Sequence, residues 1–218
     1  MSETWTVKVG AESTSAIYDR GTGDTVLVLA HGAGGNMNDG SMSKTAKCLN
    51  ARGLSVVRFN FLYKEKKSGR PDPMPKLESC FTSVVDHVRS AIDPRKVVIG
   101  GRSMGGRAAS MLASEGFDCN ALLLYAYPLH PPGRPEKLRD AHLASIEVPV
   151  LCFSGTRDPF MTPSLMENAI KSRKNWTMRW VEGADHSFHV LKSSGRNDQQ
   201  VLDEMADISV DWIARVTG

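Results

Sequence analysis

A regular alternation of short apolar runs and longer amphipathic stretches constrains this chain more than any other feature of its sequence. The run at residues 25–30, TVLVLA, is followed closely by glycines, which is typical of a strand buried on both faces. Five further runs predict strands in the same way: residues 54–61, 97–100, 121–127, 150–154 and 177–181. Two shorter segments, 5–9 and 16–19, predict an antiparallel hairpin ahead of them.

Helical periodicity fills the spaces between these runs. Apolar residues recur at three- and four-residue spacing in segments 42–52, 76–92, 103–114, 164–173 and 198–216. Strands that alternate with helices imply an open, mostly parallel, doubly wound α/β sheet with helices on both faces. In such a sheet, a ligand site is expected at the carboxyl ends of the strands.

Length and composition limit the classes of protein that this chain can represent. Its 218 residues suit one domain, residues 1–218, and 41% hydrophobic with 23% charged residues excludes a disordered chain. The net charge of +3 is too small to predict nucleic-acid binding. The segment 64–76 accounts for this surplus, and its basic side chains are either solvated or attract an anionic substrate.

Cysteine spacing and hydropathy indicate the compartment. The four cysteines, Cys48, Cys80, Cys119 and Cys152, form no CxxC pair, which argues against a zinc cage or a disulfide scaffold. The first residues, MSETWTVKVGAE, contain no secretion signal, and no apolar run approaches the roughly 18 residues of a membrane span. We therefore expect a cytoplasmic protein.

The segment GRSMGG, residues 101–106, matches the pattern G-x-S-x-G and directly follows the predicted strand VVIG. A helix is predicted to follow it, and this strand–turn–helix setting is typical of a nucleophile elbow. Gly101 and Gly105 would remove the side chains that clash in so tight a turn. The sequence therefore predicts Ser103 as a nucleophile. The alternative is a glycine-rich turn in which Ser103 caps the helix.

A serine nucleophile needs a base, and His186 follows the last predicted strand in the segment EGADHSF. His189 is the local rival, although its neighbour is a phenylalanine against which it could pack. Asp158, in SGTRDPF after another strand, is predicted to orient the histidine; a turn or helix-capping aspartate is the alternative. Asp185 adjoins the histidine and is poorly placed to hold its ring. The order Ser103, Asp158, His186 is that of a serine, acid, histidine triad.

Stabilisation of an oxyanion requires two backbone N–H donors. Met104, which directly follows the nucleophile, is predicted to supply one of them. The glycine-rich segment HGAGG, residues 31–35, is predicted to supply the other from Ala33, with Gly34 as the alternative, and Gly32 allows the close approach. His31 is predicted to brace this loop. No GK[ST] or GxGxxG pattern accompanies it, so a nucleotide site is weakly supported.

Four motifs together, HGAGG, GRSMGG, SGTRDPF and GADHSF, resemble the α/β-hydrolase superfamily. The chain is most similar to its small branch without a cap, which includes the dienelactone hydrolases. The segment YPLHPPGRPEKLRDAHL, residues 127–143, resembles a group of predicted hydrolases that includes a testis-expressed protein and a subunit of a histone-acetyltransferase complex. True dienelactone hydrolases use cysteine as nucleophile, whereas this chain has Ser103.

The segment between residues 127 and 148 is too short for a large cap, so we expect an exposed cleft. Leu129, His130 and Met161 are predicted to line it. Arg102, beside the nucleophile, either favours an anionic group or pairs with a surface carboxylate.

The leading hypothesis is a carboxylesterase-like serine hydrolase that cleaves small or medium esters or thioesters through an acyl-enzyme, with no metal or organic cofactor. We expect a monomer or homodimer with no nucleic-acid or membrane partner. The alternative is a binding or scaffold protein that keeps the fold without catalysis.

Overall fold

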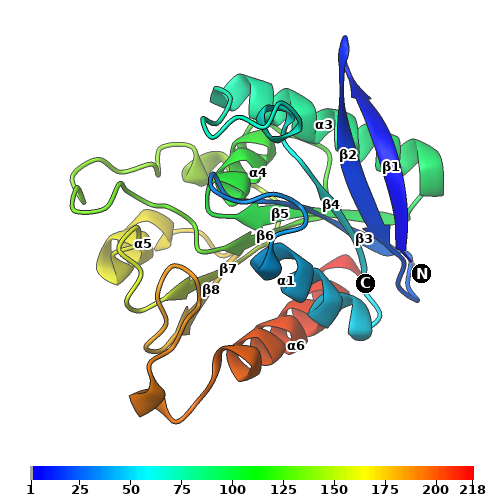
Figure 1. Ribbon diagram of the computed structural model, residues 1–218. Helices are drawn as coiled ribbons and strands as arrows, with labels where there is room; N and C mark the ends of the chain where they lie inside the picture. Colours follow the sequence, from blue (N-terminus) through cyan, green and yellow to red (C-terminus); the bar gives the residue numbers. More distant parts are fainter. Residues whose placement is uncertain (1) are drawn as a thin grey trace.

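An eight-stranded sheet forms the centre of the computed structural model, which describes residues 2–218 (Figure 1). The strands lie in the order β1-β2-β4-β3-β5-β6-β7-β8. β2 is antiparallel to both of its neighbours, and all the other pairs are parallel. The strand bounds are β1 Ser2–Val9, β2 Glu12–Asp19, β3 Thr25–Ala30, β4 Ser55–Phe59, β5 Lys96–Arg102, β6 Ala121–Tyr125, β7 Val150–Gly155 and β8 Trp176–Val181.

In the part of the chain that the structure describes, six α-helices connect or flank these strands. They are α1 Gly40–Ala51, α2 Leu62–Glu65, α3 Met74–Ile92, α4 Met104–Ser114, α5 Pro163–Ile170 and α6 Asp198–Thr217. The predicted mostly parallel α/β sheet and its leading hairpin are confirmed, with bounds that differ from the predicted ones by a few residues. The short helix α2 was not predicted, because one turn is too short to show a helical period.

Helices cover both faces of the sheet. α1 and α6 lie together on one face, where their apolar side chains share a core with β3, β6 and β7 (Figure 1). α3 and α4 pack on the opposite face. A doubly wound arrangement of this kind leaves the strands buried on both sides, which explains why residues of β4, β6 and β7 are buried throughout.

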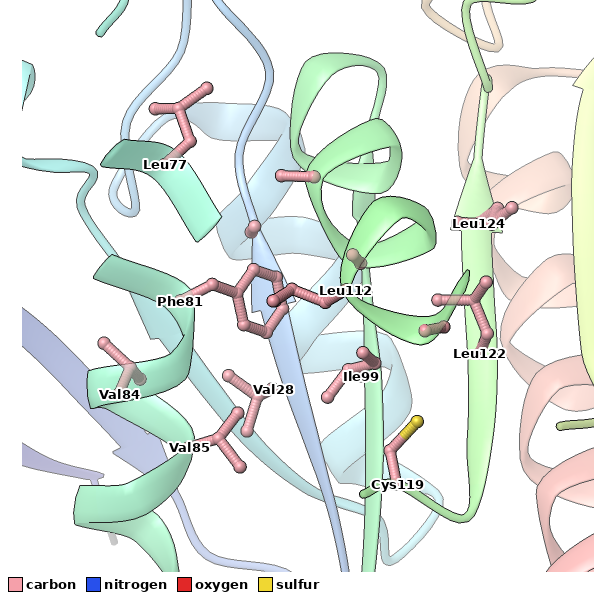
Figure 2. Close-up of a cluster of buried hydrophobic side chains, with 14 of the residues drawn as sticks. Val28, Leu77, Phe81, Val84, Val85, Ile99, Leu112, Cys119, Leu122 and Leu124 are labelled. Atoms are coloured by element: carbon pink, nitrogen blue, oxygen red, sulfur yellow. The ribbon is translucent and has the colours of Figure 1, made fainter. Parts of the chain in front are cut away.

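The core beneath α3 and α4 is built from the apolar stripe of each helix. Figure 2 shows Phe81 and Val84 of α3 and Leu112 of α4 beside Val28 and Ile99 of the sheet. All but Leu112 are fully buried, and Leu112 is 7% exposed. This packing fixes α4, and with it the junction between β5 and α4, against the middle of the sheet.

The sheet reverses its winding between β3 and β5. From β3 the chain moves to β4 on one side, and it then returns to β5 on the other side. At such a switch point, the loops that follow the two central strands diverge and leave a crevice at their carboxyl ends. The segments after β3 and after β5 are therefore the two sides of the expected ligand site.

Within residues 2–218, no helix combines the length and apolar character needed to cross a bilayer.

Candidate active site

Ser103 lies between the end of β5 and the start of α4 in a strained backbone conformation. Its φ of 50° and ψ of −116° are unusual for a residue with a side chain. A Cβ added at Gly101 would lie 2.5 Å from the carbonyl carbon of Gly105, and one at Gly105 would lie 2.5 Å from the Ala30 carbonyl oxygen. The turn therefore needs glycine at both positions, and it holds the serine hydroxyl clear of the sheet.

The side chains of Ser103, His186 and Asp158 form a continuous hydrogen-bonded relay. His186 Nε2 lies 3.0 Å from Ser103 Oγ, and His186 Nδ1 lies 2.8 Å from Asp158 Oδ2. The Asp158 side chain is fully buried, whereas that of His186 is 21% exposed. Because the ionised carboxylate can only accept, Nδ1 carries the proton and Nε2 is left to accept one from the serine hydroxyl.

Contacts from several segments hold the acid and the base in place. The second carboxylate oxygen of Asp158 accepts a hydrogen bond from the Phe160 N–H at 2.8 Å. The ring of Phe160 lies against the imidazole of His186, with 4.3 Å between the ring centroids. Arg102 donates to the His186 carbonyl at 2.8 Å. A Cβ at Gly155 would overlap the Ala184 carbonyl oxygen. The close contact between β7 and the loop that carries His186 therefore requires glycine at position 155.

The rival histidine, His189, is turned away from Ser103. Its Nδ1 lies 2.9 Å from Asp198 Oδ2, and both side chains are 58% exposed. The carboxylate of Asp198 accepts a hydrogen bond from His189, and this bond together with the charge of Asp198 raises the pKa of His189. Asp185 accepts hydrogen bonds from the N–H groups of Ser187 and His189, which shapes the loop instead of orienting a ring.

The loop after β3 is held from inside by His31, as predicted. The Phe61 N–H donates to His31 Nε2 at 3.1 Å, so Nδ1 carries the proton that is donated to the Gly32 carbonyl at 2.7 Å. Burial lowers the pKa of His31, which favours this neutral form. Tyr63 Oη donates to the Ala33 carbonyl at 2.8 Å.

These two bonds also orient the neighbouring N–H groups. In a trans peptide the C=O and N–H point in opposite directions, and residues 2–218 contain no cis peptide. The N–H of Ala33 therefore points away from His31, and the N–H of Gly34 points away from Tyr63. Gly32 is less constrained than predicted, because an added Cβ would meet only ordinary contacts at 3.5 Å.

An open cleft of about 670 Å³ surrounds the Ser103 hydroxyl. The loop after β3 and the start of α4 form one part of its lining, and Phe160 and His186 form another. Three arginine side chains, Arg102, Arg107 and Arg139, also line it.

The predicted lining residues Leu129, His130 and Met161 are wrong. Leu129 is fully buried in the core, and Met161 is buried in the same core. His130 is buried too, with hydrogen bonds to the Pro131 carbonyl and the Thr162 hydroxyl. The cleft is lined instead by Pro128, which directly precedes Leu129, and by Phe160, which directly precedes Met161.

Sequence reasoning missed Arg107, Arg139 and Phe160 as lining residues. Arg107 had a usable signal, because it lies four residues after Ser103 on a predicted helix and therefore on the same face. Arg139 lies in an irregular segment, where no periodicity indicates the direction of a side chain. Arg102 does not pair with a surface carboxylate; it bonds to the His186 carbonyl.

Several known proteins are similar to this chain in sequence or fold. A family model described as "Alpha/beta hydrolase domain" matches residues 23–214. A dienelactone hydrolase from Anabaena variabilis ATCC 29413 has a similar structure, with a TM-score of 0.77 and 20% identity over 99% of this chain and 98% of that one. Protein XC6422 from Xanthomonas campestris, described as an α/β serine hydrolase without lid, gives a TM-score of 0.74 and 18% identity, covering 97% and 94%. The esterase Pf2001 from Pyrococcus furiosus gives 0.78 and 14%, covering 100% and 91%. At these identities, the structural likeness concerns the fold.

Proposed function

Since the chain belongs to the alpha/beta hydrolase domain family, we propose that it is a serine hydrolase that cleaves small or medium carboxylic esters or thioesters. The family and the small fold without a cap, both predicted from the sequence motifs, are confirmed. The relay from Asp158 through His186 to Ser103 is the observation that carries the proposal. Membership of the narrower group with the testis-expressed protein remains a prediction.

In the proposed acylation step, Ser103 Oγ attacks the substrate carbonyl carbon while His186 Nε2 takes the hydroxyl proton. Asp158 holds the Nδ1–H tautomer and stabilises the imidazolium that forms. The carbonyl then reforms, the bond to the alcohol or thiol breaks, and His186 returns the proton to that leaving group. In the second half of the reaction, His186 takes a proton from a water molecule, which attacks the acyl-enzyme. The bond to Ser103 Oγ then breaks, His186 returns the proton to the serine, and the acid is released.

The negative oxygen of the tetrahedral intermediate needs donors on the other side of the nucleophile. The N–H of Met104 is available, because it is the first residue of α4 and the first N–H groups of a helix have no partner within it. The second donor is the N–H of Ala33, with Gly34 as the alternative. The bonds of His31 and Tyr63 support this role because they turn both N–H groups away from the core.

The shape of the cleft supports the proposed substrate size. It is open to solvent beside Ser103, and its volume of about 670 Å³ suits a small or medium acyl ester. Our proposed location is the cytoplasm, since all four cysteines are free thiols, as is usual in a reducing compartment. As partners we propose small-molecule substrates and no nucleic acid or membrane, with residues 1–218 acting as one domain in a monomer or homodimer.

Labelling with a fluorophosphonate probe tests the proposal directly. We expect the wild-type protein to react at Ser103, and the variant Ser103→Ala to lose labelling together with at least about a thousandfold of kcat on p-nitrophenyl butyrate. Ser164→Ala is the matched control, because Ser164 is exposed on α5 and outside the cleft. A folded wild-type protein that neither reacts with the probe nor hydrolyses the ester would contradict the proposal and favour a binding protein.

A further inference from the structure

Three arginines line the proposed catalytic cleft without an ion-pair partner. Within residues 2–218, no carboxylate lies within 4.0 Å of the guanidinium of Arg102, Arg107 or Arg139. Other arginines of this chain, such as Arg52 and Arg58, pair with aspartates at 2.5 and 3.1 Å. The cleft therefore brings together three guanidinium groups whose charge no carboxylate of the described residues compensates within 4.0 Å.

Arg102 occupies the position closest to the chemistry. It directly precedes Ser103, and one of its guanidinium nitrogens donates to the His186 carbonyl. Burial lowers the pKa of Arg102, which reflects the cost of holding this charge away from water. Arg102 lines both the cleft and a smaller cavity of about 370 Å³.

Arg107 and Arg139 lie close enough to interact and line the same cleft as Arg102. Burial and the charge of Arg107 lower the pKa of Arg139, and the same two causes lower the pKa of His142 to about 4. Nε of Arg107 is buried and finds no hydrogen-bond partner in the described chain. Like charges that are partly desolvated and close together destabilise a protein unless an anion compensates them.

The nearby acids act on these arginines only from a distance, because none of their carboxylates lies within 4.0 Å of the three guanidinium groups. Asp39 lines the cleft, but its carboxylate accepts from the N–H of Met42 and Asn36 and from the Ser41 hydroxyl, as the cap of α1. Glu78 of α3 lies beyond 4.0 Å from Arg107, and burial raises its pKa. Asp158 is buried behind His186 and is committed to it.

We propose that Arg102, Arg107 and Arg139 form an anion subsite that binds a carboxylate or phosphate group of the substrate. The inference rests on the proposed function and narrows it to esters or thioesters that carry such a group. Guanidinium groups suit this role because each presents several N–H donors in a planar fork that matches the oxygens of both anions.

Matched p-nitrophenyl esters test the subsite. The anionic substrates are the mono-p-nitrophenyl esters of glutaric acid and of 4-phosphonobutanoic acid, and the neutral ones are the pentanoate and the methyl ester of the glutarate. We expect kcat/KM to be at least about tenfold higher for an anionic ester than for its neutral counterparts, chiefly through KM. The preferred anion identifies carboxylate or phosphate chemistry. Equal or lower values for both anionic esters would overturn the proposal.

Single variants show which side chains produce the preference. Arg107→Gln and Arg139→Gln should each reduce the ratio of anionic to neutral kcat/KM by at least about threefold, and Arg107→Lys should restore part of it. Arg134→Gln is the matched control, because Arg134 is exposed on the same irregular segment and outside the cleft. A preference that survives both glutamine variants, or that Arg134→Gln removes equally, would contradict the assignment.

Binding to a Ser103→Ala variant separates this inference from the proposed function. Calorimetric titration with the anionic and neutral esters measures affinity without turnover, so the subsite is tested even if the wild-type protein fails to react with the fluorophosphonate. Stronger binding of an anionic ester that Arg139→Gln abolishes supports the subsite. Equal affinities would overturn it, whatever the catalytic result.

Discussion

His186 and His189 are close neighbours in the sequence, and each pairs with an aspartate at nearly the same distance. His186 and Asp158 are 2.8 Å apart, and His189 and Asp198 are 2.9 Å apart. Their surroundings are opposite: the Asp158 side chain is completely buried, whereas both members of the second pair are 58% exposed. Only the first pair contacts a serine hydroxyl, at 3.0 Å.

A hydrogen bond of given length therefore has no fixed chemical value. In water, an exposed ion pair is screened and contributes little, whereas a buried carboxylate acts through a medium of lower dielectric constant. The buried pair is also held by neighbours, since Phe160 packs on the imidazole and Gly155 lets β7 touch the histidine loop. The exposed pair bridges the loop to the start of α6.

The same substitution in each acid gives the largest contrast. Asp158→Asn should lower kcat on p-nitrophenyl butyrate by about 10³–10⁴, because the amide no longer holds the Nδ1–H tautomer of His186. Asp198→Asn should change kcat by less than about twofold, because His189 does not contact Ser103. Circular dichroism would verify that both variants fold. Comparable losses of kcat in both would abolish the distinction between the pairs.

One glycine near each pair allows the two surroundings to be compared by their effect on stability. Gly155→Ala should lower the free energy of unfolding by at least about 2 kcal/mol. The added Cβ would overlap the carbonyl oxygen of Ala184, at the contact between the end of β7 and the loop that carries His186. Gly195→Ala, between His189 and Asp198, should cost about 1 kcal/mol, because its φ of 68° is strained for alanine but no atom lies within 4 Å. Urea denaturation measures both; a larger loss at Gly195 would contradict the packing argument.

The smallest effect is a pH dependence of the exposed pair. The hydrogen bond that His189 donates to Asp198 raises the pKa of His189 above its ordinary value. The stabilisation of the fold by this pair is therefore complete below the ordinary pKa and disappears as pH rises through the raised pKa. The melting temperature of the wild-type protein should therefore exceed that of Asp198→Asn by a larger margin at pH 5.5 than at pH 8.5. The two margins should differ by at most about 2 °C. His189→Gln should show the same pattern against wild type. A difference that grows with pH would reverse the sign and refute this account.

The sequence alone predicted the regular part of the fold. Strands such as β3 and β7 are short apolar runs, and helices such as α3 carry a clear apolar stripe, so periodicity located them within a few residues. The positions that the structure brings together, Ser103, Asp158 and His186, each follow a different strand. Parallel strands deliver their carboxyl ends to one edge of the sheet, which is why strand order was sufficient to group them.

The remaining lining of the cleft was beyond sequence reasoning because it depends on side-chain direction in irregular backbone. In the segment after β6, Leu129 and His130 point inward while Pro128 and Arg139 reach the cleft. No repeat of two or 3.6 residues operates there. The need for glycine at position 155 was equally hidden, because the atom that an alanine would strike belongs to Ala184 on another strand's loop.

The distribution of the relay over three strand ends has a consequence for protein synthesis. A growing chain acquires Ser103 first, then Asp158, and the base last, on the loop that joins β8 to α6. The nascent polypeptide therefore cannot perform the proposed hydrolysis while it is still incomplete at β8. We therefore expect the proposed hydrolysis to begin only after β8 and the loop that carries His186 have been synthesised and have packed against β7.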